Sequence, residues 1–246
     1  MGKLILGLTL FLLSPLSGAS AAESVCLWSG EKINSPSVVK IKLCSLSQIS
    51  PQLVAQAKAD KTFTKLIPTE KNTIRFALMS YVRVSPEKFL ALLNDHATIR
   101  RLIENIKELK TLEVRNMDEL ASLNAQYAQT HSDIDFESST FTKTKIWYGK
   151  KPPIGVTVNR LNHTYDFYDE EKNLNSVSNM ISADKYFDSS HMIWTFTPFD
   201  GGTLIQLYSE DKINVSFPEF VLNMIKKEAP EETVKLISKL KNELAP

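Results

Sequence analysis

Residues 74–94 read IRFALMSYVRVSPEKFLALLN, and this stretch decides the fold. Apolar side chains alternate with others from Ile74 through Phe76 to Val84, a period of two that predicts a half-buried strand over 74–84. Ser85-Pro86-Glu87 follows directly and supplies an N-cap hydroxyl, a proline for the first helical position and an acid for the first turn. We therefore expect a strand that leads at once into a helix over 86–94.

Outward from this stretch, the pattern predicts a second short helix and then a long run of strands. Ile99, Leu102 and Ile106 recur at helical spacing and predict a helix over 97–106. Beyond it, short alternating segments are separated by turn signals such as Asp200-Gly201-Gly202, which indicates an antiparallel meander. The strands that we expect are 109–117, 121–129, 138–148, 156–168, 174–183, 189–197 and 203–211.

The last element is a long amphipathic helix, expected from Phe217-Pro218 to about Leu244. Pro230 lies inside it and should kink or split it. A curved sheet with one apolar face must cover that face, and this helix has the length to do so. The predicted fold class is α+β, an antiparallel sheet curved around the C-terminal helix with space between them.

Three stretches together carry a family pattern: YVRVSPEKFLALLND at 81–95, WTFTPFDGGT at 194–203, and Phe217-Pro218 before the long helix. They resemble the START-like (SRPBCC) superfamily, which includes polyketide cyclases and coenzyme-Q-binding START proteins. The resemblance covers about residues 74–244 and consists of structural patterns, without a catalytic signature. It implies a helix-grip fold whose internal cavity takes a hydrophobic small molecule of the lipid, sterol or isoprenoid type. The N-terminal segment and the long middle strands depart from the family pattern.

The N-terminus has the three parts of a secretory signal peptide, which we assign to residues 1–21. Lys3 is followed by an apolar run from Leu4 to Leu13 and by small residues at 18–22, which predicts cleavage after Ala21 or Ala22. Removing residues 1–21 deletes Lys3 and no acid, so 29 basic and 28 acidic residues become 28 and 28. A neutral chain gives no indication of nucleic-acid binding. We expect an exported protein, periplasmic or secreted, and two glycosylation sequons leave a eukaryotic route open.

Residues 22–72 are expected to form an N-terminal extension, and residues 73–246 the START-like domain. Cys26 and Cys44 both lie in the extension, and a lone pair of cysteines in an oxidising compartment predicts a disulfide. A metal pair or a catalytic thiol would need further partners nearby, and the extension offers none. Its other predicted element is a helical stretch over 51–66.

Strand parity suggests which side chains face the cavity that the resemblance implies. Residues 161–167 carry an aromatic face opposite a more polar one that includes Thr164 and Asp166. We expect the aromatic face to be the inner one. The alternative is that the same aromatics fill a solid core. The cavity candidates are Leu161, His163, Tyr165, Phe167, Met192, Trp194, Phe196, Ile205, Leu207, Val221 and Met224.

His163 is the most informative of these residues, because a histidine on an apolar face needs a polar partner. Either a ligand oxygen supplies that partner, or the backbone or a neighbouring tyrosine satisfies a structural histidine. The four histidines have no metal-ligand spacing, and we expect no metal site and no cofactor.

Sequence motifs for common enzyme classes are absent, including GxSxG, the P-loop and GxGxxG. We therefore expect binding without catalysis. Two alternatives stay open. One is a cyclase or dehydratase in which His163 and Tyr165 act as acid and base, and the other is a structural or partner-binding envelope protein.

A basic and aromatic stretch suggests a transient membrane contact. Four lysines, at positions 143, 145, 150 and 151, bracket Trp147 and Tyr148. Such a surface could meet anionic lipid during ligand exchange. A solvated, charged strand edge explains the same pattern.

Overall fold

The computed structural model describes residues 24–29, 40–67, 69, 72–151, 154–184, 186–214 and 219–244. Residues 1–21, assigned to the signal peptide, lie outside them. One eight-stranded sheet dominates the molecule, in the order β3-β4-β10-β9-β8-β7-β6-β5 with every neighbouring pair antiparallel. Its strands are β3 (Phe63–Ile67), β4 (Thr73–Val82), β5 (Ile106–Leu112), β6 (Ser139–Lys151), β7 (Ile154–Tyr168), β8 (Leu174–Ala183), β9 (Phe187–Phe199) and β10 (Gly202–Ile213).

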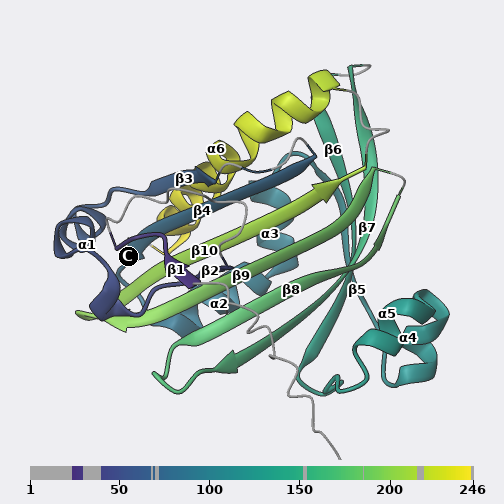
Figure 1. Ribbon diagram of the computed structural model, residues 1–246, viewed down its shortest axis with the longest axis horizontal. Helices are drawn as coiled ribbons and strands as arrows, with labels where there is room; N and C mark the ends of the chain where they lie inside the picture. The colour runs from purple at the N-terminus through teal and green to yellow at the C-terminus, as the bar shows by residue number, and fades with distance from the viewer. Residues whose placement is uncertain are drawn as a thin grey trace, which may run out of the picture.

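The long C-terminal helix α6 (Glu219–Glu243) packs on the concave side of this sheet together with α2 (Pro86–Asn94) and α3 (His96–Leu102). Ser85 caps α2 by accepting a hydrogen bond from the N–H of Lys88, as the sequence predicted. Pro230 lies inside α6 without dividing it. The predicted α+β architecture, a curved antiparallel sheet gripping a C-terminal helix, is therefore confirmed (Figure 1).

The N-terminal extension lies on the opposite, outer side. It contains β1 (Ser24–Cys26) paired in parallel with β2 (Lys40–Lys42), the 3-10 turn Leu46–Gln48 and α1 (Pro51–Lys58). Figure 1 draws β1 and β2 in front of β9 and β10, with α2 and α3 behind the strands. The predicted disulfide joins Cys26 to Cys44, whose Cα atoms are 5.0 Å apart.

Buried Gln206 fastens this extension to the sheet. Its side-chain amide nitrogen, Nε2, donates to the carbonyl of Cys44 at 2.7 Å, and its Oε1 accepts from the N–H of Cys44 at 3.0 Å. The side chain has no exposed surface. One glutamine therefore satisfies both backbone groups of a cysteine 162 positions earlier in the chain.

The segment expected as a strand over 121–129 is instead two helices, α4 (Met117–Leu123) and α5 (Ala125–Thr130). Asn116 accepts a hydrogen bond from the N–H of Glu119, and Asn124 accepts one from the N–H of Tyr127. These side-chain caps start each helix. The buried side chains of this segment are Leu120 from α4 and Tyr127 and Ala128 from α5.

Other boundaries moved for local reasons. The helix expected over 51–66 ends at Lys58; Asp60 has a φ of 68°, and the chain then becomes β3, which belongs to the main sheet. The helix expected over 97–106 ends at Leu102, and the strand expected over 109–117 begins earlier, at Ile106, and ends at Leu112. The extension therefore contributes an edge strand to the sheet, and is more than an appended loop.

Candidate functional site

The eleven predicted cavity residues do not share one face of the sheet. The register pairs Tyr165 with Val177, and Val177 with Ile193. Trp194 is instead in line with Ser176 and Asp166. Directly paired residues lie on the same face, and their chain neighbours lie on the other. Leu161, His163, Tyr165 and Phe167 are therefore on the outer face, which corrects the expectation that they line the same cavity as Trp194.

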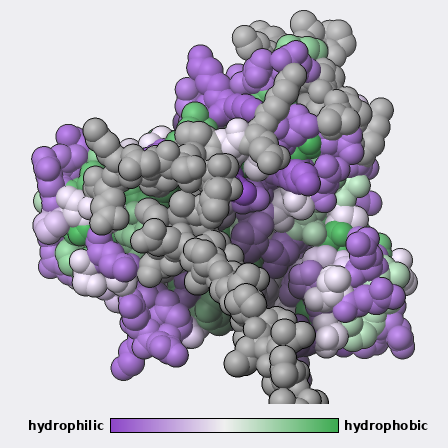
Figure 2. Space-filling view, in the orientation of Figure 1, coloured by the Kyte–Doolittle hydropathy of each residue, from purple (hydrophilic) through white to green (hydrophobic). Residues whose placement is uncertain are grey.

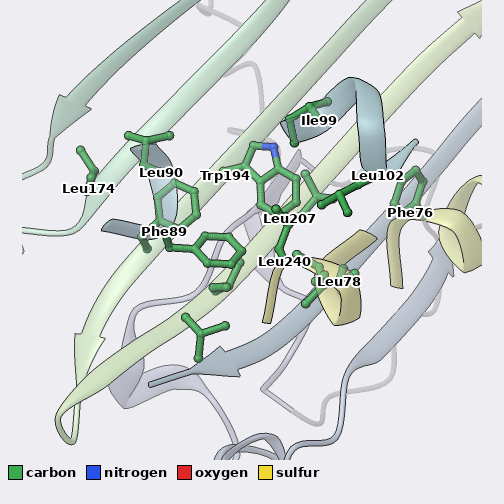
Figure 3. Close-up of a cluster of buried hydrophobic side chains, with 14 residues drawn as sticks. Phe76, Leu78, Phe89, Leu90, Ile99, Leu102, Leu174, Trp194, Leu207 and Leu240 are labelled. Carbon is green, nitrogen blue, oxygen red and sulfur yellow. The ribbon is translucent and has the colours of Figure 1, made fainter. Parts of the chain in front are cut away.

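The concave set forms a packed core. Phe196, Ile205 and Leu207 have no exposed surface, and Trp194 is 9% exposed. The rings of Trp194 and Phe196 stack at 6.1 Å, and Phe89 of α2 lies 5.9 Å from Phe196. Figure 3 shows these aromatics gathered with leucines of β4, β10, α2 and α6. This half of the predicted cavity is filled by protein.

The remaining candidates lie at the margins of that core. Met192 is half-buried against it, and the indole N–H of Trp194 donates to the Met192 sulfur at 3.2 Å. Met224 packs in a separate cluster around Ile225, near the beginning of α6. The side chain of Val221 lies outside the described residues.

His163 is a structural histidine on the outer face. It is 3% exposed; its Nδ1 lies 3.0 Å from the hydroxyl of Tyr127 and its Nε2 lies 2.8 Å from the hydroxyl of Ser139. Burial, with a smaller contribution from His131, lowers the pKa of His163 to about 4. Both ring nitrogens of His163 therefore have partners within the protein. Of the two explanations that the sequence left open, the structural one, in which a neighbouring tyrosine is the partner, holds. His163 is on the outer face and is not placed to act on a ligand in the concave cavity.

An aromatic row surrounds His163 on the outer face. The Phe141 ring stacks on it at 4.9 Å, and Tyr165 lies 5.4 Å away on the other side and stacks in turn on Phe167 at 6.0 Å. Leu161 joins the apolar cluster beneath α4 and α5. Burial raises the pKa of Tyr127 to about 12. Together, α4 and α5 therefore cover a part of the sheet that sequence reasoning placed inside.

The open part of the concave side lies beside the α2–α3 corner, over β5, β6 and β7. It is a hollow of about 450 Å³. Its lining is mostly hydroxyl, carboxylate and amide side chains: Asn94, Asp95, His96, Ala97, Thr111, Thr140, Thr142, Thr164 and Asp166. Its volume is within the range of small-molecule sites.

Asp166 is the most unusual residue of this hollow. Among the described residues its Oδ1, which is buried, has no hydrogen-bond partner, and its Oδ2 accepts only a long hydrogen bond, 3.5 Å, from Asn94. A buried carboxylate oxygen without a partner is uncommon in folded proteins. Rotation of the carboxyl group toward the hollow would bring this oxygen within reach of a hydroxyl or amine of a bound molecule.

Two rows of paired residues lead from the polar hollow to the apolar core. In the first row Thr164 is paired with Ser178, and Ser178 with Met192. In the second row Asp166 is paired with Ser176, and Ser176 with Trp194. Sequence reasoning had found Thr164 and Asp166 on the more polar face but took that face as the outer one. The alternation of polar and aromatic residues was predicted correctly, but the choice of the concave face was wrong. That choice required recognising that α4, α5 and the extension cover the other face of the sheet.

The predicted membrane-contact stretch is divided between surface and interior. Lys143 and Lys145 are exposed and Trp147 is half-buried, whereas Tyr148 packs 5.8 Å from Phe187 in the cluster at the start of α6. The side chains of Lys150 and Lys151 lie outside the described residues. None of the described helices has the length and apolar character needed to cross a membrane, and no group of three metal-ligating side chains occurs within the described ranges.

Comparison with solved structures identifies the fold. A STAR-related lipid transfer protein from Xanthomonas axonopodis superposes with a TM-score of 0.54 and 12% identity, covering 73% of this chain and 93% of its own. An aromatase/cyclase from a Streptomyces species (TM-score 0.49, 8% identity, 70% and 93% covered) and a START superfamily protein from Mycobacterium smegmatis (0.44, 16%, 69% and 95%) also match. No family model matches the sequence, and no curated protein is significantly similar to it. The chain thus has a START-like helix-grip fold.

Proposed function

From this START-like fold, we propose that the protein binds an amphipathic small molecule of the lipid, sterol or isoprenoid type in the concave hollow, without catalysis and outside the cytoplasm. The observation that carries the proposal is the unpartnered Asp166 oxygen at the side of a 450 Å³ hollow. The similar lipid transfer protein adds support from the fold. The export component is supported by the sequence of residues 1–21 and by the disulfide.

The hollow and the border of the core beside it favour different parts of such a ligand. Thr142, Thr164 and Asp166 line the hollow and offer hydroxyl and carboxylate groups to a polar head. Met192, which is half-buried, lies outside this lining at the border of the apolar core, and a chain or ring that reaches past the hollow would contact it. Burying apolar ligand surface contributes about 25 cal/mol per Å², so an apolar body with one polar group suits this combination.

Catalysis is the less favoured alternative. The acid and base pair proposed for it, His163 and Tyr165, belongs to the outer face, on the other side of the sheet from the hollow. His163 is also held by Tyr127 and Ser139. A purely structural role would leave the hollow without a ligand, and the experiment below distinguishes it.

The first measurement is a mass spectrum of the organic extract of the purified protein, which we expect to contain a bound lipid. The second is uptake of a fluorescent long-chain alcohol by the stripped protein. Asp166→Asn and Thr164→Val should each weaken uptake by about two- to tenfold, the equivalent of one hydrogen bond. Asp118→Asn is the matched control, because Asp118 is an exposed acid of α4 far from the hollow lining.

Two outcomes would overturn the proposal. One is an empty extract together with no uptake of the probe by the unmodified protein. The other is equal loss of uptake in Asp166→Asn and Asp118→Asn, which would point to a general charge effect. In either case the structural reading would replace ligand binding.

A further inference from the structure

A second hollow lies on the outer face, between the N-terminal extension and the sheet. Its volume is about 500 Å³. One wall comes from the extension beside the disulfide, and the floor comes from β7, β8, β9 and β10. The lining consists of Leu43, Cys44, Ser45, Gln48, Phe167, Asp169, Glu171, Asn173, Asn175, Val177, Ile193, Thr195 and Tyr208. We call it the outer pocket; it is separate from the concave hollow, which lies on the other face.

The walls of the outer pocket are held in place by the contacts that fasten the extension. Gln206 bonds both backbone groups of Cys44. On the floor, Thr195 donates to the Oδ1 of Asn175 at 2.6 Å, and Asn175 donates to Asp169 at 3.1 Å. Asn175, Thr195 and Gln206 are all buried. Hydrogen bonds therefore fix both the wall and the floor of the outer pocket.

The chemical character of the pocket is acidic and aromatic. Among the described residues that line it, Asp169 and Glu171 are the charged ones, and there is no lysine, arginine or histidine. Phe167 is 43% exposed, which is unusual for a large aromatic ring, and Tyr208 is half-buried. Val177 and Ile193 supply an apolar floor.

The two carboxylates have different roles. Asp169 accepts hydrogen bonds from the backbone N–H and the side-chain amide of Asn173 and from the amide of Asn175. Although burial acts in the opposite direction, these bonds hold the pKa of Asp169 below its usual value, so it stays charged. Glu171 is exposed at the rim, where a ligand can reach it. Lys172 is in the same turn but is not part of the lining.

Negative charge next to aromatic rings and an apolar floor is complementary to an organic cation. A positive charge is attracted by carboxylates and by the faces of aromatic rings. A small apolar body on that cation would cover Val177 and Ile193. We propose that the outer pocket binds a small organic cation, an amine or quaternary ammonium group on a short apolar body, as a site independent of the concave hollow.

Titration calorimetry with the phenethylammonium ion tests this proposal, with the neutral 2-phenylethanol as a probe of the same size. We expect the cation to bind at least about tenfold more tightly than the alcohol, because only the cation interacts with the carboxylates and the rings. Glu171→Gln should weaken binding of the cation by about threefold, as for a partly exposed charge pair, and leave the alcohol unaffected.

Glu170→Gln is the matched control. Glu170 is exposed in the same turn and carries the same charge, but it does not line the pocket. Equal effects of Glu170→Gln and Glu171→Gln, or equal binding of the cation and the alcohol, would overturn the proposal.

Phe167→Ala tests the aromatic wall at an exposed residue, and a thermal melt checks that the variant keeps its fold. We expect about a fivefold loss of cation binding. Asp166→Asn should leave cation binding unchanged, since Asp166 belongs to the concave hollow. Loss of binding in Asp166→Asn but not in Phe167→Ala would place the cation in the concave hollow and overturn the outer site, whatever the outcome for the lipid probe.

Discussion

At the scale of single residues, burial decides what His163 does. The enclosed imidazole is neutral in the folded protein, because its pKa is lowered from 6.5 to about 4. In the unfolded chain the same group takes up a proton as the pH falls through about 6.5. Between these two pH values the unfolded chain binds more protons than the folded one, so acidification favours unfolding.

We therefore predict that stability falls as the pH is lowered from 6.5 to 4, and that His163 accounts for about 2–3 kcal/mol of the fall. His163→Gln should be less stable at neutral pH but lose less stability over this pH range. Urea denaturation of both proteins at several pH values measures the difference. Parallel stability curves for the two proteins would contradict the prediction.

The sequence predicted that His163 needs a partner but did not identify which one. The partner Tyr127 is 36 positions away and reaches the imidazole from α5. Residues 121–129 were expected to form a strand, and a tyrosine in a strand has no reason to meet this histidine. The need of His163 for a polar partner could therefore be predicted from the sequence. Its pairing with Tyr127 could not, because the prediction for residues 121–129 was a strand and α5 is a helix.

At the scale of elements, side-chain caps made residues 117–130 helical, although apolar alternation had predicted a strand over 121–129. The helices α4 and α5 are only seven and six residues long. Helices this short are marginal by themselves, so they depend on their caps and on the buried side chains beneath them. Asn116 and Asn124 provide those caps, and the sequence analysis did not identify them as such. In contrast, the elements with strong signals over ten or more residues, such as β8 and α6, were predicted close to their observed bounds.

We predict that both asparagines stabilise the protein and that Asn124 contributes more. Asn116→Ala should cost about 1 kcal/mol, the usual value for an N-cap. Asn124→Ala should cost about 2 kcal/mol, because Asn124 also donates to the carbonyl of Ile181 at 2.6 Å and ties α5 to the sheet. Thermal or urea denaturation measures both. A larger loss for Asn116→Ala would contradict this ranking.

At the scale of the whole molecule, both faces of the sheet are covered over much of their area. The sequence predicted a sheet with one apolar face, covered by the C-terminal helix. Instead, α2, α3 and α6 cover the concave face, while the extension, α4 and α5 cover the other (Figure 1). Figure 2, which views the outer side, shows hydrophilic residues recessed near its centre beside the atoms drawn in grey. Parity along a strand cannot distinguish two faces that are both covered.

Export is a prediction about the whole chain. We expect the mature protein to begin at Ala22 or Glu23 and to be recovered from the periplasm or the medium. N-terminal sequencing together with cell fractionation measures both properties. Recovery of Met1 with the membrane fraction would instead indicate an uncleaved signal anchor.

The bond between Gln206 and Cys44 has a consequence for the order of folding. Residues joined here are 162 positions apart, and β4 likewise pairs with β10, with Ile74 opposite Asp211. Contacts of such long sequence separation form late, so β4, which pairs early with β3, lacks its other neighbour until β10 is present. A chain that emerges N-terminus first must wait for β10 before the extension can dock. For the exported chain that we propose, this order would delay docking of the extension until translocation is nearly complete, so the segment would still be unfolded while it crosses the membrane.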